Sequence, residues 1–194
     1  MATVPTRRRT QPPEVRREQL LDAAAAVIVE KGFASTTVAD VAERAGVAKG
    51  TVYLYFDTKE DLVTGLQARY ASALVDLARA LNEGTGSEIA RLESFLRETV
   101  GFHVSERELH EMLFHQAGMR DGDALHALSR ELQTFVESGV ASGTFAVADA
   151  GFTTQFLLHG LHGALVSFLH HPRTSRAKFV ASCLEVCRRL LGVK

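Results

Sequence analysis

The stretch TTVADVAERAGVAKGTVYLYFDTKEDL, residues 36–62, decides the fold of this chain. Its first apolar residues follow the i, i+3, i+4, i+7 spacing of one helix face, and they are Val38, Val41, Ala42 and Ala45. Thr37 stands where an N-cap is expected, and Asp40 supplies a weaker form of the capping box because its side chain is shorter than that of the usual Glu. The pattern predicts a two-turn helix.

A second short helix is predicted from Lys49 to Phe56. Gly46 separates it from the first helix, because glycine adopts the left-handed conformation that ends a helix without steric cost. Val52 and Phe56 would pack back on the first helix, which leaves a largely polar outer face. Two short helices joined in this way form a helix-turn-helix, whose second helix enters the major groove of DNA.

The same segment resembles the DNA-binding signature of the TetR family of bacterial transcription regulators. The motifs that carry the resemblance are, in order, GF (Gly32, Phe33), TT (Thr36, Thr37), VADVAERAGV, KGTVYLYF and TKEDL. One departure is Ala48, since the family usually has Ser or Thr before the lysine. Alanine cannot cap the second helix or offer a hydroxyl to phosphate, and loss of such a cap typically costs about 1 kcal/mol of helix stability.

The motif positions and the helix faces predict two kinds of DNA contact. We expect Thr51 and Tyr53 to meet base edges, whereas Thr37, Tyr55 and Lys59 hold phosphates. The full set expected at the DNA interface is Arg7, Arg8, Arg9, Thr36, Thr37, Lys49, Gly50, Thr51, Tyr53, Tyr55 and Lys59. The arginines belong to an N-terminal arm, which either reaches the minor groove or a phosphate or is only a solvated tail.

Charge and composition fit a protein that holds DNA at one end. The chain has 194 residues, 46% of them hydrophobic, and a formal net charge of −1, so bulk charge does not attract nucleic acid. Residues 1–17 hold five arginines against one glutamate, which leaves the rest of the chain acidic. We expect a disordered basic arm over 1–13, a helix-turn-helix DNA-binding domain over 14–58, and a helical ligand-binding and dimerisation domain over 59–194.

The rest of the chain also has helical periodicity, and the predicted fold class is all-α with about nine helices. Asp57 and Thr58 are expected to cap a fourth helix, which would link the DNA-binding domain mechanically to the body. The segment from Ser105 to Glu108 predicts a capping box that opens another helix. The apolar positions expected inside a later helix are Leu125, Leu128, Leu132, Phe135 and Val140.

Two final helices are predicted from Asp149 to Pro172 and from about Ser175 to Leu191. Small residues along one side of the first favour close approach of another helix. The TetR resemblance implies that both helices pack against their copies in a homodimer, and packing within the monomer is the alternative. The residues expected at the dimer interface are Gly160, Gly163, Ala164, Ser167, Phe179, Cys183 and Cys187.

A drug-sized ligand pocket is expected among apolar and adaptable side chains of the body. Its predicted residues are Phe102, Met112, His115, Gln116, Met119 and Phe156, although the same residues would also fill a plain core. The effector that would bind there is not identified by the sequence.

No metal site and no cofactor are predicted. No two of His103, His110 and His115 have the i, i+3 or i, i+4 spacing that places ligands on one helix face. His159 and His162 do have that spacing. The only two cysteines, Cys183 and Cys187, are too far apart on a helix for an easy disulfide. We interpret them as small buried side chains, with a thiol sensor as the alternative.

The sequence predicts a homodimeric transcriptional repressor that binds a near-palindromic operator and is released by a small-molecule effector. No phosphate loop, nucleophile elbow or paired Cys/His site supports an enzyme. The alternatives are an architectural or division protein of the same fold without an effector, and an all-α enzyme or carrier with a helix-turn-helix-like segment. The longest apolar run, Ala23 to Val29, is far too short to span a membrane, so a cytoplasmic location is expected.

Overall fold

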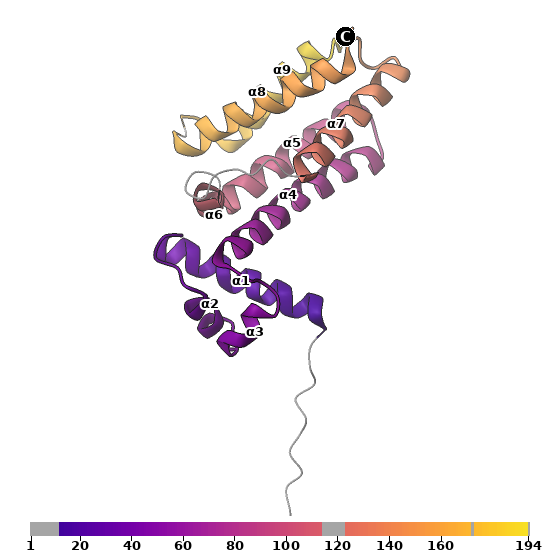
Figure 1. Ribbon diagram of the computed structural model, residues 1–194. Coiled ribbons are helices and arrows are strands. Elements are labelled where there is room, and N and C mark those ends of the chain that lie inside the picture. Colours follow the sequence, from indigo (N-terminus) through magenta and orange to yellow (C-terminus); the bar gives the residue numbers. More distant parts are fainter. Residues whose placement is uncertain (1–11, 114–122, 172, 194) are drawn as a thin grey trace, which may run out of the picture. The chain divides into compact units, whose positions relative to one another are not determined.

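The computed structural model describes residues 12–113, 123–171 and 173–193. Over these residues it contains nine α-helices and no strand, which confirms the all-α class (Figure 1). The helices are α1 (Pro13–Lys31), α2 (Val38–Arg44), α3 (Lys49–Tyr53), α4 (Lys59–Glu83), α5 (Glu88–Ser105), α6 (Arg107–Glu111), α7 (Asp123–Ala141), α8 (Ala150–His170) and α9 (Arg176–Leu190). Within the described ranges, no helix is long and apolar enough to cross a membrane.

The chain divides into two compact units, and the boundary falls inside α4. Unit 1 contains the chain up to Leu66 and the segment that begins at Met112. It includes α1, α2, α3 and the start of α4. Unit 2 contains Gln67–Glu111 and the chain from Met119 onward, and so includes the rest of α4 and helices α5 to α9.

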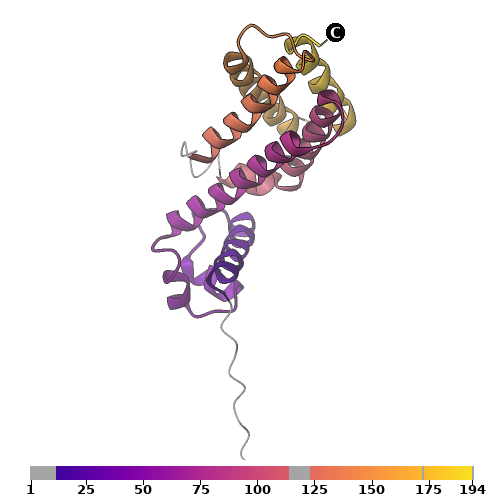
Figure 2. The same cartoon turned by 90° about the vertical axis from the view of Figure 1, so that its right-hand side faces the viewer.

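Unit 1 is a small helical bundle built on the inner face of α1 (Figure 2). α1 packs against α2, and α2 packs against α3. Fully buried side chains come from all three helices and include Leu20, Leu21, Ile28, Val41 and Val52. Phe56 is buried after the end of α3, and the guanidinium of Arg17 lies over its ring at 5.2 Å from the centroid.

The turn between α2 and α3 forms as the sequence predicts. Gly46 has φ +65°, and its amide donates to the carbonyl of Glu43 at 3.0 Å. The next amide, that of Val47, donates to the carbonyl of Ala42 at 3.0 Å. This pair of hydrogen bonds is the Schellman motif, which requires a left-handed residue at Gly46. At the opposite end of α2, Thr37 is the N-cap of a complete capping box.

Unit 2 packs α5 against α9 and α7 against α8, and α8 also contacts α9. A buried cluster joins these helices with α4, and its members include Leu81, Leu96, Val100, Phe135, Leu165 and Cys187. Gly139 of α7 makes room for Phe145, because a Cβ at this glycine would lie 2.0 Å from the phenyl ring. The ring of Phe145 meets that of Phe135 edge-on, with centroids 5.6 Å apart.

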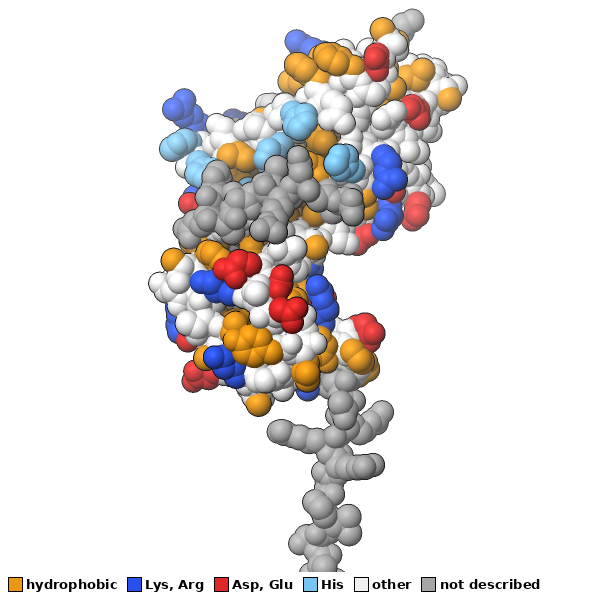
Figure 3. Space-filling view, viewed as in Figure 1, with side chains coloured by type: hydrophobic (Ala, Val, Ile, Leu, Met, Phe, Trp, Pro, Cys, Tyr) orange, Lys and Arg blue, Asp and Glu red, His pale blue; other side chains and the backbone are white. Residues whose placement is uncertain are grey.

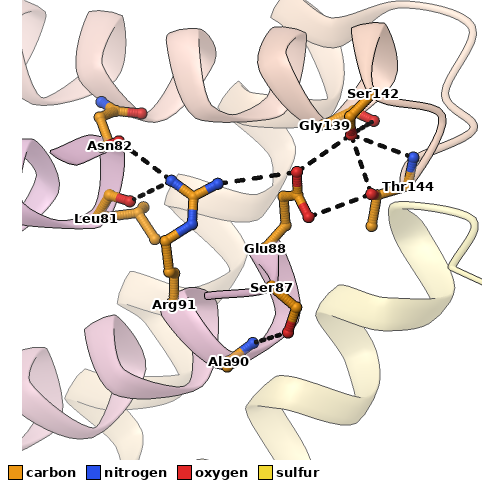
Figure 4. A network of polar contacts seen from close by, with 9 residues as sticks. All are labelled: Leu81, Asn82, Ser87, Glu88, Ala90, Arg91, Gly139, Ser142 and Thr144. Carbon is orange, nitrogen blue, oxygen red and sulfur yellow. Dashed lines mark hydrogen bonds and ion pairs between the residues drawn. The ribbon is translucent and has the colours of Figure 1, made fainter. Parts of the chain in front are cut away.

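A polar network fastens the start of α5 to the ends of α4 and α7 (Figure 4). The guanidinium of Arg91 donates to the carbonyl of Leu81 at 2.9 Å and to the next carbonyl at 3.1 Å. It thereby satisfies carbonyls in the last turn of α4, which lack helical partners. Arg91 also lies 3.9 Å from Glu88, whose carboxylate accepts 3.2 Å hydrogen bonds from the hydroxyls of Ser142 and Thr144.

Two local predictions are wrong. The predicted capping box from Ser105 to Glu108 does not form, although α6 does begin close by, at Arg107. Ser105 is instead the last residue of α5, and its hydroxyl donates to the carbonyl of Phe102 at 2.9 Å. The helix still breaks there, with Glu106 as the C-cap. On α7, Val140 is 39% exposed, and Val136 occupies the buried position one turn earlier.

Candidate functional site

The exposed face of the helix-turn-helix is formed by α3. Lys49 and Tyr53 are both exposed, and the ammonium lies 5.7 Å from the centre of the phenol ring. Thr51 is half-buried on the same helix. A Cβ added at the exposed Gly50 would meet no atom within 4 Å, so a partner can approach this backbone closely. These four predicted DNA-binding residues therefore lie on one accessible helix.

One end of α3 is as predicted and the other is not. At the N-terminal end, Ala48 has extended backbone angles of φ −69° and ψ 145° and makes no side-chain cap. At the C-terminal end, α3 stops at Tyr53, earlier than predicted, with Leu54 as the C-cap. Leu54 is 80% exposed, the highest value among the large apolar side chains of the described residues. The sequence did not indicate that Leu54 would be exposed, because the helix was predicted to continue to Phe56.

The start of α2 is held by charge as well as by its cap. The carboxylate of Asp40 accepts hydrogen bonds from the amide and the hydroxyl of Thr37, at 2.9 and 2.8 Å. The ammonium of Lys31 lies 2.8 Å away on the same carboxylate. Lys31 first, and then Thr37, lower the pKa of Asp40 to about 2. The capping carboxylate is therefore charged at neutral pH, and the Thr37 hydroxyl already has a partner within the protein.

Two other predicted DNA residues have structural roles. Thr36 is 2% exposed and its hydroxyl donates to the carbonyl of Gly32 at 2.8 Å, so its predicted DNA contact is wrong and it stabilises the turn after α1 instead. Lys59 donates to the carbonyl of Phe33 at 3.0 Å and lies 4.3 Å from the centre of that ring. Because an ammonium has three donors, Lys59 keeps capacity for a phosphate. Tyr55 is half-buried, and the predicted Arg7, Arg8 and Arg9 lie outside the described residues.

Unit 2 contains a partly open cavity of about 130 Å³. Its wall comes mainly from α5, α7, α8 and α9, and α4 contributes Leu74 and Leu81. Most of the lining side chains are Leu, Val or Phe, and no charged Lys, Arg, Asp or Glu from the described part of the chain reaches the wall. On α5 the wall extends from Leu92 to His103, a rise of about 16 Å along the helix axis. The cavity is thus apolar and elongated.

Polar side chains of the wall gather near the C-terminal end of α5. Thr99 and His103 lie one turn apart, and Nδ1 of His103 is 2.8 Å from the backbone carbonyl of Thr99. His162 of α8 lines the cavity as well. Burial lowers the pKa of His103, which is 4% exposed, so its ring is neutral at pH 7.

Aromatic rings surround this polar end. The centroid of His103 lies 5.7 Å from that of Tyr70, 5.8 Å from that of Phe102 and 5.7 Å from that of His110. The His110 ring, which is also buried, lies 6.3 Å from His162. Burial raises the pKa of Tyr70, so its phenol is neutral too. The described residues contain no group of three or more His, Cys, Asp or Glu side chains placed to hold a metal ion.

Exposed histidines also mark the outer surface of unit 2. They include His159, His162 and His170 of α8, and Figure 3 shows histidine side chains gathered over this part of the molecule. The sequence did not indicate that His103 and His110 come together, because the break after α5 brings α6 back against it. This proximity depends on tertiary packing rather than on helical spacing.

Of the six predicted pocket residues, the three that the structure describes do not line the cavity. Phe156 is 57% exposed on the outside of α8, while Leu157 and Leu161 of the same helix line the cavity. Phe102 packs on the ring of Tyr70 at 4.8 Å between centroids, and neither Phe102 nor Met112 is part of the wall. The other three predicted pocket residues, His115, Gln116 and Met119, lie outside the described residues.

Four predicted dimer residues lie on an open face of α8. Ala164 and Ser167 are exposed, and a Cβ added at Gly160 or Gly163 would meet no atom within 4 Å, so the alternative of close packing inside the monomer is excluded for the two glycines among the described residues. The same helix exposes Phe152 and Phe156, at 71% and 57%. On α9, the exposed large apolar residues are Val186 and Leu190.

The three predicted dimer residues of α9 lie elsewhere. Cys183 and Cys187 are buried and line the cavity, so their assignment to the interface is wrong. Phe179 also lines the cavity and stacks on Phe168, with ring centroids 4.4 Å apart. Burial raises the pKa of Cys187 to about 12 and also raises that of Cys183. Both thiols are protonated at neutral pH, which argues against a reactive thiol sensor.

Comparison with known proteins places the helix-turn-helix in a family. Residues 20–66 match the family described as bacterial regulatory proteins, tetR family. The chain is 38% identical over 80 residues to the fatty acid metabolism regulator protein of Bacillus subtilis, covering 41% of this chain and 34% of that protein. It is 36% identical over 78 residues to the HTH-type transcriptional repressor KstR2 of Mycobacterium tuberculosis, covering 40% and 39%. The alignments thus span well under half of these relatives.

The fold of the whole chain also has solved counterparts. The structure of the transcriptional regulator FadR from Bacillus subtilis in complex with stearoyl-CoA has a TM-score of 0.72 and covers 90% of this chain and 97% of its own. The two sequences are 21% identical, a likeness that establishes a common fold. The helix-turn-helix segment, residues 20–66, therefore matches the tetR family of bacterial regulatory proteins, and the chain as a whole shares the fold of this solved regulator.

Proposed function

We propose that this protein is a ligand-responsive transcriptional repressor that binds a near-palindromic operator as a homodimer and is released by a small-molecule effector. The observation that carries the proposal is the open face of α3, where Lys49, Thr51 and Tyr53 project from a well-formed helix-turn-helix. The relative from Mycobacterium tuberculosis is named a transcriptional repressor, which supports the direction of regulation. An effector is supported by the uncharged cavity in unit 2.

The DNA contacts divide by chemistry. Thr51 and Tyr53 are proposed to meet base edges, and the exposed Leu54 is suited to the methyl group of thymine. The proposed phosphate contacts come from Lys49, Lys59, Tyr55 and the arginines of the N-terminal arm, together with the backbone at Gly50. Phosphate contacts set affinity for all DNA, whereas base contacts set the preference among sequences.

Paired variants test this division. An operator is first selected from random duplexes, and affinities are then measured by fluorescence anisotropy over a range of salt. Lys49→Ala is expected to weaken all duplexes alike and to reduce the salt slope by about 1. Thr51→Ala is expected to change the ranking of operators. Arg130→Ala, at an exposed position of α7, is the charge control and is expected to change neither the ranking nor the salt slope. Equal loss on every duplex from Thr51→Ala would contradict the base-edge assignment.

The homodimer is proposed to form through α8 and α9. The small residues Gly160 and Gly163 allow close helix approach, and exposed Phe152, Phe156 and Val186 offer apolar surface that would otherwise remain in water. Two copies related by a two-fold axis read the same half-site twice, which requires a near-palindromic operator.

Sedimentation velocity tests the interface. Gly163→Leu is expected to separate the paired helices and to yield monomers that bind the operator poorly. Ser138→Leu, at an exposed position of α7, is the matched control and is expected to remain dimeric. A Gly163→Leu protein that stays dimeric would place the interface on another face.

The effector is proposed to act by widening the cavity in unit 2. The cavity of about 130 Å³ is smaller than ligand pockets of roughly 300–1,000 Å³, so a ligand of that size would have to separate the helices around it. FadR of Bacillus subtilis was solved with stearoyl-CoA, a ligand with a long apolar chain, and an effector with an apolar portion suits the present wall. α4 lines the cavity with Leu74 and Leu81 and begins in unit 1, so it is the proposed link to the helix-turn-helix.

Release follows if the ligand has unequal affinity for the two conformations. A coupling of about 1–3 kcal/mol would lower operator affinity by roughly 5–150-fold, and reciprocity requires operator DNA to weaken the ligand by the same factor. The test is a thermal-shift screen of apolar compounds, followed by titration of each hit against labelled operator. Release of the operator supports the proposal, whereas a broad screen without any effect on operator affinity would favour an architectural DNA-binding protein.

A further inference from the structure

One polar group in the cavity wall lacks a partner. The hydroxyl oxygen of Thr99 is buried, and among the described residues it makes no hydrogen bond. It belongs to the wall of the cavity, on the inner side of α5. A buried hydroxyl is normally satisfied by protein, water or ligand, because an unmade hydrogen bond is costly away from bulk water. Thr154, the other threonine of the wall, differs because its hydroxyl donates to the carbonyl of Ala150 at 2.8 Å.

His103 supplies a complementary acceptor one turn away. A carbonyl can only accept, so the 2.8 Å contact with the carbonyl of Thr99 fixes the hydrogen of the neutral ring on Nδ1. The other nitrogen, Nε2, then carries a lone pair. Thr99 and His103 therefore offer one hydroxyl donor and one nitrogen acceptor on adjacent turns of the same cavity-lining helix.

The surroundings limit which ligand group can use this pair. Tyr70 and His110 face the His103 ring from α4 and α6, and His162 lies beside it on α8. The described part of the cavity wall has no Lys or Arg to pair with a carboxylate and no Asp or Glu to pair with an ammonium. Burying an unpaired charge is far more costly than burying a neutral polar group.

We propose that Thr99 and His103 bind a hydroxyl group of an effector that is otherwise apolar and uncharged. The ligand hydroxyl accepts from Oγ1 of Thr99 and donates to Nε2 of His103, while its hydrocarbon body lies along the wall towards Leu92. A carbonyl oxygen could satisfy only the Thr99 donor, whereas a hydroxyl satisfies both groups. This inference rests on the proposed function, since it names the effector class for the same cavity.

The probes are four ligands with the same six-carbon chain: hexanol, chlorohexane, hexanoate and hexylamine. Their affinities for the full-length dimer are measured by isothermal titration or by competition with a solvatochromic dye. Hexanol is expected to bind the wild-type protein at least tenfold more tightly than hexanoate or hexylamine. Tighter binding of the acid or of the amine would overturn the inference.

Threonine-to-valine substitutions identify the contact, because they remove a hydroxyl while keeping the shape. Thr99→Val is expected to lower the ratio of hexanol affinity to chlorohexane affinity by about tenfold. Thr154→Val, in the same wall but already hydrogen-bonded, is the matched control and is expected to leave the ratio unchanged. His103→Phe is expected to lower the ratio as Thr99→Val does.

The outcomes separate this inference from the proposed function. If Thr99→Val weakens hexanol and chlorohexane by the same factor, the residue acts only on cavity shape and the inference is wrong. Hexanol that binds with the expected ratios but never alters operator affinity would leave the hydroxyl site standing and refute the regulatory role of the cavity. If another compound releases the operator but the wild-type protein shows no preference for hexanol, the regulatory role of the cavity stands and the hydroxyl site is refuted.

Discussion

Filling the cavity is expected to stabilise the protein and to abolish its response to ligands. Val136 of α7 lines the cavity and is 4% exposed, so Val136→Phe would extend a ring into the empty space. Cavities cost about 24 cal/mol per Å³ in proteins studied by core truncation. For 130 Å³ this gives a ceiling of about 3 kcal/mol, and partial filling should raise the free energy of unfolding by about 1–2 kcal/mol.

The assay is urea unfolding at one protein concentration, because a dimer's stability depends on concentration. Val140→Phe is the matched control: it lies one turn further along α7, is 39% exposed and does not line the cavity. It is expected to change the urea midpoint little. The thermal shift caused by a cavity ligand should disappear in Val136→Phe and persist in Val140→Phe.

Either of two results would refute this reasoning. A Val136→Phe protein less stable than Val140→Phe would show that the space next to Val136 cannot take a ring, since overpacking strains a core. A ligand-induced thermal shift and operator release that survive in Val136→Phe would show that effectors bind elsewhere. In both variants, unchanged operator affinity without ligand would show that the helix-turn-helix is intact.

Three further predictions follow from single contacts. Ala48→Ser is expected to raise the free energy of unfolding by about 1 kcal/mol and to tighten operator binding, because the extended backbone of Ala48 already suits an N-cap; an unchanged urea midpoint would contradict this. Gly139→Ala is expected to destabilise the protein by up to about 2 kcal/mol, because a Cβ there would clash with Phe145. Gly101→Ala, where a Cβ meets only ordinary contacts, should instead show the helix gain of about 1 kcal/mol; equal urea midpoints for the two variants would argue against the clash. Burial lowers the pKa of His103 in the folded state, so below about pH 6.5 the unfolded chain binds more protons than the folded one. The free energy of unfolding should therefore be full above that pH and fall on acidification by at most about 1.4 kcal/mol per pH unit. The urea midpoint of His103→Phe should fall less steeply with pH than that of the wild type, and identical slopes would show that His103 does not contribute.

Local chemistry allowed much of unit 1 to be predicted. The cap at Thr37, the left-handed turn at Gly46 and the missing cap at Ala48 all depend on neighbours within a few residues, and the structure has each of them. Periodicity likewise predicted the extents of α4, α8 and α9, because the spacing of the apolar residues along the chain defines the apolar face of a helix. Prediction was poorer where a residue had two possible partners, as with Ser105, whose hydroxyl bonds back to α5 instead of capping α6.

The sequence by itself determined the helical class, the helix-turn-helix and most helix ends, because these follow from interactions between residues close along the chain. Only the tertiary structure decided which apolar residues enclose a cavity and which remain on the surface. Phe156 and Leu157 are adjacent and both apolar, yet one is exposed and the other lines the cavity. The side of a helix that is buried depends on where its neighbours pack, and helical spacing alone could not show that α5, α6 and α8 bring three histidines together.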